Sequence, residues 1–87
     1  MVQQWGDMNE EIDIGGMVRY HRKRADLTRI QLAALAGVGK TVVFDIEANK
    51  QSVKCSTLRN VLQALNIRIL FESPLMEEYR KQQNAKR

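Results

Sequence analysis

Three features of this 87-residue sequence predict an all-α fold of four to five short helices with a single short β-strand near the carboxyl end. Apolar residues recur at helical spacing in four consecutive segments between residues 14 and 65. One of these segments has both a start and a stop signal of a helix. A run of β-prone residues follows the last segment, over 67–72. We therefore expect a flexible arm over 1–13, a folded unit over 14–72 and a flexible tail over 73–87, which is either a fraying helix or disordered.

The first helix is expected over residues 14–24. Ile14, Met17 and Val18 form a narrow apolar stripe, and the remaining positions are mostly basic, among them Arg19 and Arg22. Such a helix packs along one side only and leaves a positively charged side exposed.

The second helix is expected to begin at Thr28 and to end at Ala36. The Thr28 hydroxyl and Gln31, three residues later, have the spacing of a capping box, in which each side chain bonds the other residue's backbone N–H. Gly37 follows, and glycine readily adopts the left-handed conformation that closes a helix.

The third helix is expected over residues 40–48. Its β-branched residues would also suit a strand, but Val43 and Ile46 share a face only at a helical period. The opposite side presents four residues that can face outward, namely Lys40, Thr41, Phe44 and Asp45.

The fourth helix, over residues 56–65, has leucine or valine at i, i+3, i+4 and i+7. The β-prone run 67–72 comes next and has no second strand to pair with in its own chain. Unpaired backbone groups are costly, so a second subunit is the simplest source of a partner strand. We expect a homodimer closed by this strand, through Ile67, Ile69, Leu70 and Phe71.

Composition narrows the function without fixing it. The net charge of +4 and the pI near 9.6 suit an anionic partner such as nucleic acid, although a solubilising surface would explain them equally well. A lone Cys55 allows neither an internal disulfide nor a metal site built of cysteines. No apolar run approaches the roughly 18 residues that span a membrane. We expect a cytoplasmic, nucleoid-associated protein without cofactor or metal.

Enzymatic function is disfavoured by the same residues. His21 is the only histidine and lies in a basic helix, and the glycines lack the spacing of a phosphate-binding loop. A protein-interaction module that does not bind DNA is the more serious alternative.

Residues 27–50 have the organisation of a helix-turn-helix, which places its second helix in the major groove of DNA. Lysine can donate to guanine, threonine can donate or accept, and an aromatic edge can meet a thymine methyl group. Asp45 can accept from cytosine or repel phosphate in a wrong register. An ordinary solvated face is the alternative, and Phe44 argues against it because an exposed phenylalanine usually has a binding partner. That partner could also be the second helix or the other subunit of a dimer.

Residues 14–67 resemble the Cro/C1-type, or xenobiotic-response-element, helix-turn-helix family, which has the lambda-repressor-like fold. The matching positions are Arg19, Arg22, Leu27-Thr28, Leu32-Ala33, Gly37-Val38, Ile46-Glu47 and Lys50. The resemblance implies a structural ion pair between Arg22 and Glu47. It also implies base contacts by Lys40, Thr41, Phe44 and Asp45, and phosphate contacts by Thr28, Arg29, Gly39 and Lys50.

Two residues depart from this family pattern. Gly39 replaces the usual serine or threonine before the recognition helix, and Asn49 stands where glycine is common, although asparagine tolerates the left-handed conformation.

The segment from Ser56 to Glu72, STLRNVLQALNIRILFE, resembles HipB-like antitoxins. In these proteins the run after the fourth helix forms a β-lid across the dimer. The resemblance implies a repressor that binds an inverted-repeat operator in double-stranded DNA, regulates its own promoter and restrains a HipA-like kinase toxin. The arm 1–13 with Trp5 and the tail 75–87 are the expected toxin contacts. A stand-alone repressor of the same family remains the alternative.

Overall fold

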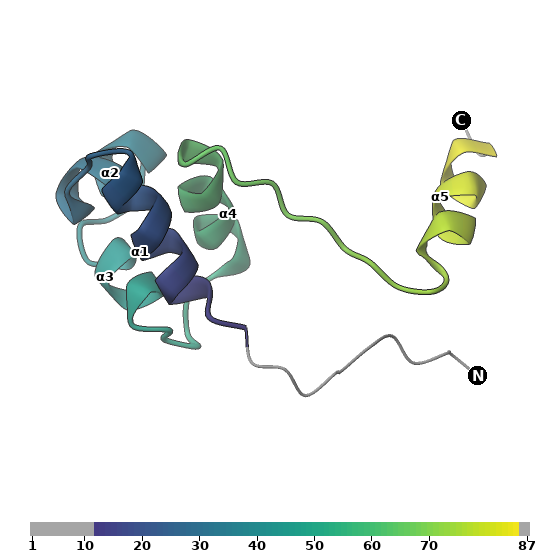
Figure 1. The fold of residues 1–87 in the computed structure, drawn as a ribbon, viewed down its shortest axis with the longest axis horizontal. Coiled ribbons are helices and arrows are strands. Elements are labelled where there is room, and N and C mark those ends of the chain that lie inside the picture. Colours follow the sequence, from purple (N-terminus) through teal and green to yellow (C-terminus); the bar gives the residue numbers. More distant parts are fainter. Residues whose placement is uncertain (1–11, 86–87) are drawn as a thin grey trace.

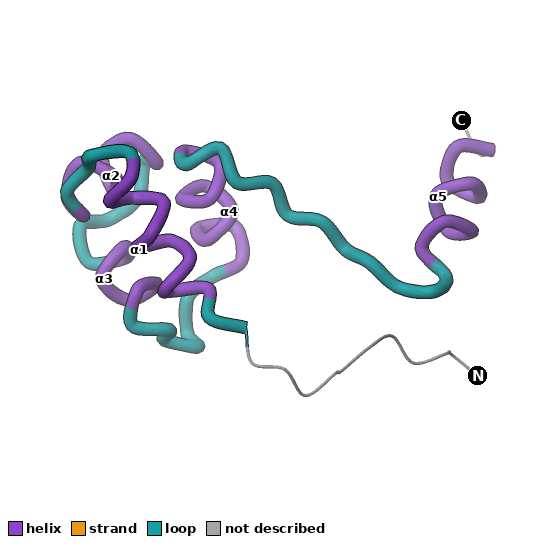
Figure 2. Tube along the Cα trace, viewed as in Figure 1, coloured by secondary structure: helices purple, strands orange, loops and turns teal. Residues whose placement is uncertain are grey.

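The computed structural model describes residues 12–85, which form five α-helices (Figures 1 and 2). Helices α1 and α2 span Ile14–Arg24 and Arg29–Ala36, and α3 spans Val42–Glu47. Helices α4 and α5 span Cys55–Ala64 and Met76–Ala85. Helices α1 to α4 pack into one body, and α5 stands apart from it at the end of an extended linker (Figure 1). Trp5 and most of the expected arm lie outside the described residues.

The core lies where the first four helices meet. Each of these helices contributes one fully buried side chain, and the four are Val18, Leu32, Val43 and Val61. Ala33, Ile46 and Leu62 complete the buried apolar cluster. The apolar faces predicted for α1, α3 and α4 are therefore the faces that these helices bury.

The helix ends explain why the chain turns where it does. Thr28 Oγ1 accepts from the Gln31 N–H at 3.0 Å, and Gln31 Oε1 accepts from the Thr28 N–H at 2.8 Å, so the predicted capping box is confirmed. Gly37 closes α2 with φ of 70°, in the left-handed region. These two signals fix both ends of the helix that precedes the recognition turn.

Helix α3 is shorter than the sequence predicts. It begins at Val42, whereas Lys40 and Thr41 lie in the turn before it, where the Val42 N–H donates to the Gly39 carbonyl at 3.2 Å. Gly39 has no side-chain oxygen to cap a helix that begins at residue 40. Thr41, which precedes α3, makes no side-chain capping bond either. Helix α4 begins and ends one residue earlier than predicted.

The segment after α4 differs most from the expectation. Residues 67–72 form no strand with any part of the described chain, because the hydrogen bonds of a ladder require a second strand. Ile67 is half-buried against the core, while Ile69, Leu70 and Phe71 are exposed. Residues 76–85, for which a fraying helix or a disordered tail was expected, form a helix with Glu77 and Glu78 in its first turn. Acidic side chains at that end favour a helix through its dipole.

No helix among residues 12–85 is long and apolar enough to cross a membrane.

Candidate nucleic-acid interface

Helix α3 sits across α2 with one side in the core and the other at the surface. Val43 and Ile46 are buried between the helices. Phe44 points outward and remains 47% exposed. Lys40 and Thr41 are exposed in the turn that leads into the helix. These three predicted base-contacting residues therefore share one accessible region at the start of α3.

Asp45, a predicted base contact, forms an ion pair with Lys50, a predicted phosphate contact. Its carboxylate lies 3.2 Å from Lys50 Nζ, and the Lys50 N–H donates to the Asp45 carbonyl at 3.0 Å. The Lys50 side chain is 61% exposed, so this pair is a surface ion pair of small energetic weight. The pairing ties the end of the recognition helix to the residue that follows it.

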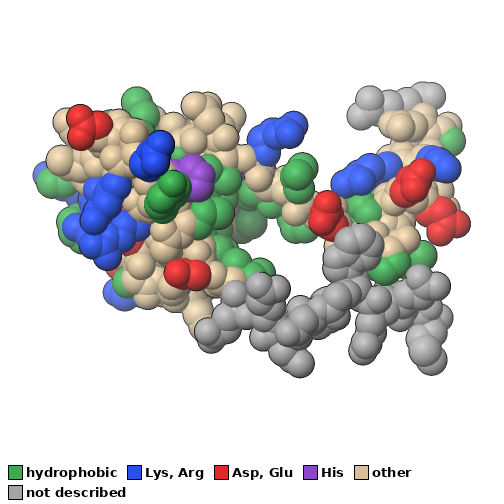
Figure 3. All heavy atoms as spheres, viewed as in Figure 1, with side chains coloured by type: hydrophobic (Ala, Val, Ile, Leu, Met, Phe, Trp, Pro, Cys, Tyr) green, Lys and Arg blue, Asp and Glu red, His purple; other side chains and the backbone are tan. Residues whose placement is uncertain are grey.

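The predicted phosphate contacts are placed differently from one another. Thr28 and Gly39 are exposed at the start of α2 and in the turn before α3. Arg29 is half-buried and is held by Glu47, with Nε donating to Oε1 at 3.1 Å. Lysine and arginine side chains gather over the part of the body where α1, α2 and α3 meet (Figure 3). That positive surface is suited to a phosphate backbone.

Arg22 and Glu47 form a buried ion pair between α1 and α3. Arg22 Nε donates to Glu47 Oε2 at 2.6 Å and Nη2 donates to Oε1 at 3.2 Å. Arg22 Nη1 also donates to the Leu27 carbonyl at 2.9 Å. The two side chains are only 8% and 5% exposed. This bidentate geometry fixes the start of α2 and the end of α3 through one guanidinium.

Glu47 is an ionised carboxylate shared by two arginines. Burial raises the pKa of the Glu47 carboxyl, but hydrogen bonds from Arg22 and Arg29 and their positive charges lower it by more. The net pKa lies below its ordinary value of 4.5. Glu47 is therefore ionised at neutral pH.

Arg29 also contacts the aromatic ring on the recognition helix. Its guanidinium carbon lies 4.9 Å from the centre of the Phe44 ring, within the range of a cation–π interaction. From the sequence, packing of Phe44 against the second helix is one alternative to a base contact, but Arg29 is not identified as its partner there. Several basic residues lie near the helix-turn-helix, and no spacing rule tells which of them reaches α3.

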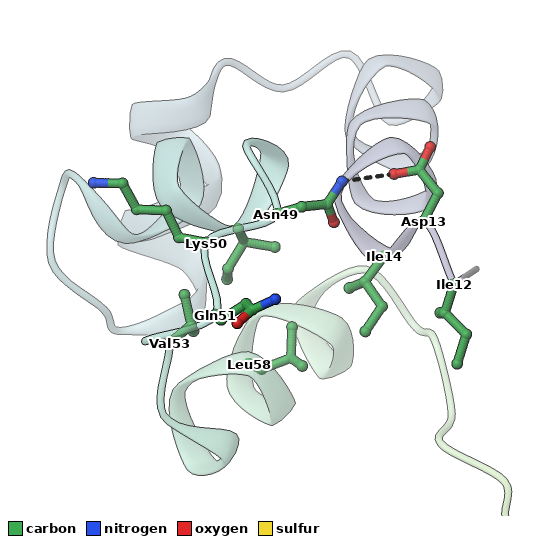
Figure 4. Close-up of a pocket in the computed structure, with 9 residues that line it drawn as sticks. Ile12, Asp13, Ile14, Asn49, Lys50, Gln51, Val53 and Leu58 are labelled. Atoms are coloured by element: carbon green, nitrogen blue, oxygen red, sulfur yellow. Dashed lines mark hydrogen bonds between the residues drawn. The ribbon is translucent and has the colours of Figure 1, made fainter. Parts of the chain in front are cut away.

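A second cluster joins the start of α1 to the end of α3. Asn49, which has φ of 57°, accepts from the Gly15 N–H at 2.8 Å and donates to Asp13 Oδ1 at 2.9 Å (Figure 4). Asp13 also caps α1 by accepting from the Gly16 N–H at 2.8 Å. Hydrogen bonds from Asn49 and then from Gly16 lower the pKa of Asp13 below its ordinary value of 3.8, against a smaller effect of burial.

Gly15 lets the two helices approach this closely. A Cβ atom added there would lie 2.6 Å from the backbone oxygen of Glu47. The left-handed tendency of Asn49 could be predicted from the sequence, but this approach of the helices and the bond to Asp13 could not. Tertiary contacts of this kind leave no periodic signal in a sequence.

An open groove lies beside this cluster. Ile12, Ile14, Val53 and Leu58 line its apolar part (Figure 4). Among residues 12–85, histidine, cysteine, aspartate and glutamate side chains form no group of three that could hold a metal ion.

Comparison with known sequences gives a consistent result. The model of a helix-turn-helix family matches residues 18–71. An uncharacterized HTH-type transcriptional regulator, y4mF, of Sinorhizobium fredii (strain NBRC 101917 / NGR234) is 39% identical over 62 residues, covering 71% of this chain and 82% of that protein. An immunity repressor protein of Bacillus phage phi105 is 33% identical over 76 residues, covering 84% of this chain and 53% of the repressor.

Solved structures share the fold at low sequence identity. A chain of a HipA-HipB-O2-O3 complex aligns with a TM-score of 0.66 and 16% identity, covering 80% of this chain and 99% of that chain. A chain of a HipB variant in complex with an O2 20mer aligns with a TM-score of 0.65 and 15% identity, covering 82% and 99%. An MDT protein aligns with a TM-score of 0.66 and 16% identity over the same shares as the first. Most of this chain thus has a fold that these solved chains share.

Proposed function

This chain belongs to the Cro/C1-type helix-turn-helix family of transcriptional regulators, and from that membership we propose that it is a sequence-specific, dimeric repressor. The observation on which the proposal depends is the exposed cluster of Lys40, Thr41 and Phe44 at the start of α3. Phe44 is 47% exposed, and an exposed phenylalanine on a helix usually contacts a partner. This exposure therefore favours a binding surface over an ordinary solvated face.

The chemistry of this cluster matches the edges of base pairs. Lysine donates to guanine O6 and N7, threonine donates or accepts, and the Phe44 ring can meet a thymine methyl group. Asp45 and Lys50, which are paired with each other, border the cluster. Thr28 and Gly39 can donate backbone or hydroxyl groups to phosphate, in the manner of helix-turn-helix proteins. We place these two, with Arg29 and Lys50, against the DNA backbone.

The linker supports the dimeric part of the proposal. Ile69, Leu70 and Phe71 lie side by side along the chain and are 42%, 65% and 70% exposed. The Phe71 carbonyl accepts from Arg80 Nη2 at 3.1 Å, and no other segment of the described chain forms a strand with residues 69–71. Exposed apolar residues in such an extended segment suit pairing with the same segment of a second copy. A two-fold dimer would then read two half-sites about one helical turn apart in an inverted repeat.

Electrophoretic mobility shift with the full chain and its own upstream DNA tests the DNA-binding function. Lys40→Ala should lower the affinity by about 1–3 kcal/mol and relax the preference at one base. Lys81→Ala removes the same charge from α5, where the side chain is 75% exposed, and should leave binding unchanged. Equal losses in the two variants would contradict recognition through α3. Wild-type protein that binds no duplex while binding a protein partner would establish the interaction-module alternative.

Light scattering tests the dimer. A chain that ends after Arg68 keeps Ile67, which packs against the core, and loses the exposed apolar linker. We expect the full chain at twice the monomer mass and the shortened chain at one monomer mass. A full-length monomer, or a shortened chain that still dimerises, would contradict pairing through residues 69–71.

The structural likeness to HipB chains supports a finer function, that of an antitoxin which represses its own promoter and binds a HipA-like kinase. Helix α5 has no buried residue, and Tyr79 is 56% exposed on it, so its surface is free to contact a second protein. The test is co-expression with any kinase-like reading frame encoded beside the gene, followed by purification on a tag carried by that kinase. Co-purification, lost on removal of 76–87, is the expected result. Failure to co-purify would leave a stand-alone repressor of the same family.

A further inference from the structure

We propose that Arg29 is a positioning residue that sets the orientation of the Phe44 ring on the DNA-reading surface, and so contributes to sequence preference in addition to any contact with phosphate. This inference rests on the DNA-binding function proposed above. It concerns two residues to which the family resemblance gives separate roles.

The contacts form a continuous series from the core to the surface. Arg22 and Glu47, both less than 10% exposed, make a bidentate ion pair in which Nε and Oε2 are 2.6 Å apart. The other carboxylate oxygen of Glu47 accepts from Arg29 Nε at 3.1 Å. The Arg29 guanidinium in turn lies 4.9 Å from the Phe44 ring centre. Arg29 and Phe44 are thus each held by a neighbour that is more deeply buried, because the Arg29 side chain is 36% exposed, Glu47 5% and Phe44 47%.

This arrangement limits the motion of both surface side chains. An arginine on a helix surface normally samples many rotamers, whereas the hydrogen bond from Nε to Glu47 restricts the positions of this guanidinium. Phe44 is 47% exposed and would otherwise be free to rotate about its side-chain bonds. A planar cation against one part of the ring leaves the remainder available to a base. Desolvation by bound DNA would strengthen the contact, because cation–π attraction increases when water is excluded.

Lysine is the informative replacement for Arg29. Arg29→Lys keeps the positive charge for phosphate and for Glu47 but removes the planar group that meets the ring. Binding of the full-length wild type, Arg29→Lys, Phe44→Ala and the double variant to a library of operator duplexes gives the preference at each base position. Arg59→Lys, on the exposed surface of α4, is the matched control for the exchange itself.

We expect Phe44→Ala to weaken discrimination at one base position of each half-site by about 10-fold, within the range of a base contact. Arg29→Lys should weaken discrimination at the same position by about 3-fold, in line with a partly exposed cation–π contact. Its slope of log affinity against log salt should match the wild type. The double variant should lose no more than Phe44→Ala alone, because the two residues act through one ring.

Three outcomes would overturn the inference while leaving DNA recognition intact. The first is an unchanged base preference in Arg29→Lys, and the second is a change at a position different from that of Phe44→Ala. The third is an equal loss on all sequences with a salt slope reduced by about one, which identifies a phosphate contact alone.

The free protein provides a separate measurement. The Arg29 side-chain protons should have upfield NMR shifts from the Phe44 ring current, and these shifts should disappear in Phe44→Leu. Their presence in wild-type protein that binds no DNA would overturn the proposed function and the specificity role while verifying the contact itself. Their absence would overturn the positioning role directly.

Discussion

The four-helix body and the carboxyl-terminal segment 67–85 contain similar kinds of side chains in different surroundings. In the body, Val18, Leu32, Val43 and Val61 are fully buried, one from each helix. In the segment, Leu70 and Phe71 are 65% and 70% exposed, and α5 buries no residue. The body therefore folds on apolar contacts within its own chain. Ile67 packs against the body, whereas Ile69, Leu70 and Phe71 are exposed and would be buried only by a surface that a second molecule supplies.

The ion pairs of the two regions differ in the same way. Arg22 and Glu47 are 8% and 5% exposed, at 2.6 Å. Lys81 and Glu77 on α5 are 75% and 85% exposed, at 3.7 Å. Removal of one partner from a buried pair leaves the other charge without water or counter-charge, whereas an exposed charge is simply solvated. An ion pair thus contributes appreciably to stability in the body and little on α5.

The largest expected difference is between the two glutamates. Glu47→Ala should lower the free energy of unfolding by about 3–5 kcal/mol, because Arg22 stays buried and uncompensated. Glu77→Ala should change it by less than about 0.5 kcal/mol. Chemical denaturation of both variants, monitored by circular dichroism, measures the difference. Similar effects in the two variants would show that burial does not determine how much an ion pair contributes to the stability of this protein.

A smaller effect is expected at Gly15, where α1 approaches the end of α3. A Cβ atom there would lie 2.6 Å from the Glu47 backbone oxygen, and the backbone must move to make room. Gly15→Ala should therefore cost about 1–3 kcal/mol in unfolding free energy. At Gly39 an added Cβ would meet only Val42, at 3.9 Å, so Gly39→Ala should be close to neutral. A stable Gly15→Ala protein would show that the contact between the helices can adjust.

The stability of the body should depend on pH through Glu47 and, to a lesser degree, the exposed Asp13. In the folded chain the pKa of each carboxyl lies below its ordinary value, which applies in the unfolded chain. At a pH between the folded and the unfolded pKa of such a group, the unfolded chain therefore binds more protons than the folded chain. The unfolding free energy should be level above about pH 5, and it should fall as the pH drops below 4.5, the ordinary pKa of the glutamate. Chemical denaturation at a series of pH values from about 3 to about 7 measures this dependence of the unfolding free energy.

Glu47→Gln and Glu77→Gln provide the comparison for that pH profile. The first should flatten the acid limb, while the second should preserve it, because Glu77 on α5 is 85% exposed. An acid limb of unchanged slope in Glu47→Gln would assign the dependence to other carboxyls.

The smallest effect is expected at Tyr79 on α5. The side chain is 56% exposed and the helix has no buried residue, so Tyr79→Ala should change the unfolding free energy by less than about 0.5 kcal/mol. Thermal denaturation at low and high protein concentration provides the measurement. A loss above about 1 kcal/mol that grows with concentration would show that a second copy covers α5 and would end the contrast between the regions.

The local signals in the sequence were sufficient for the four helices of the body. Apolar spacing identified the buried faces, and the Thr28–Gln31 capping box with Gly37 placed α2 to within a residue. These features depend on residues one turn apart, which interact wherever a helix forms. Exposure of Lys40, Thr41 and Phe44 followed from the same period, although Lys40 and Thr41 precede the helix. The DNA-contact roles of these residues stay predictions.

Family resemblance supplied the association of Arg22 with Glu47, and only the tertiary structure joined Arg29 to Glu47 and Phe44, and Asn49 to Asp13 and Gly15. These partners lie 15–36 positions apart and meet because the helices cross at particular places. The strand expected over 67–72 remains open for a related reason. By itself the sequence determined a β-prone, apolar run, but a strand exists only when a second backbone supplies its hydrogen bonds, and within residues 12–85 no other segment does so.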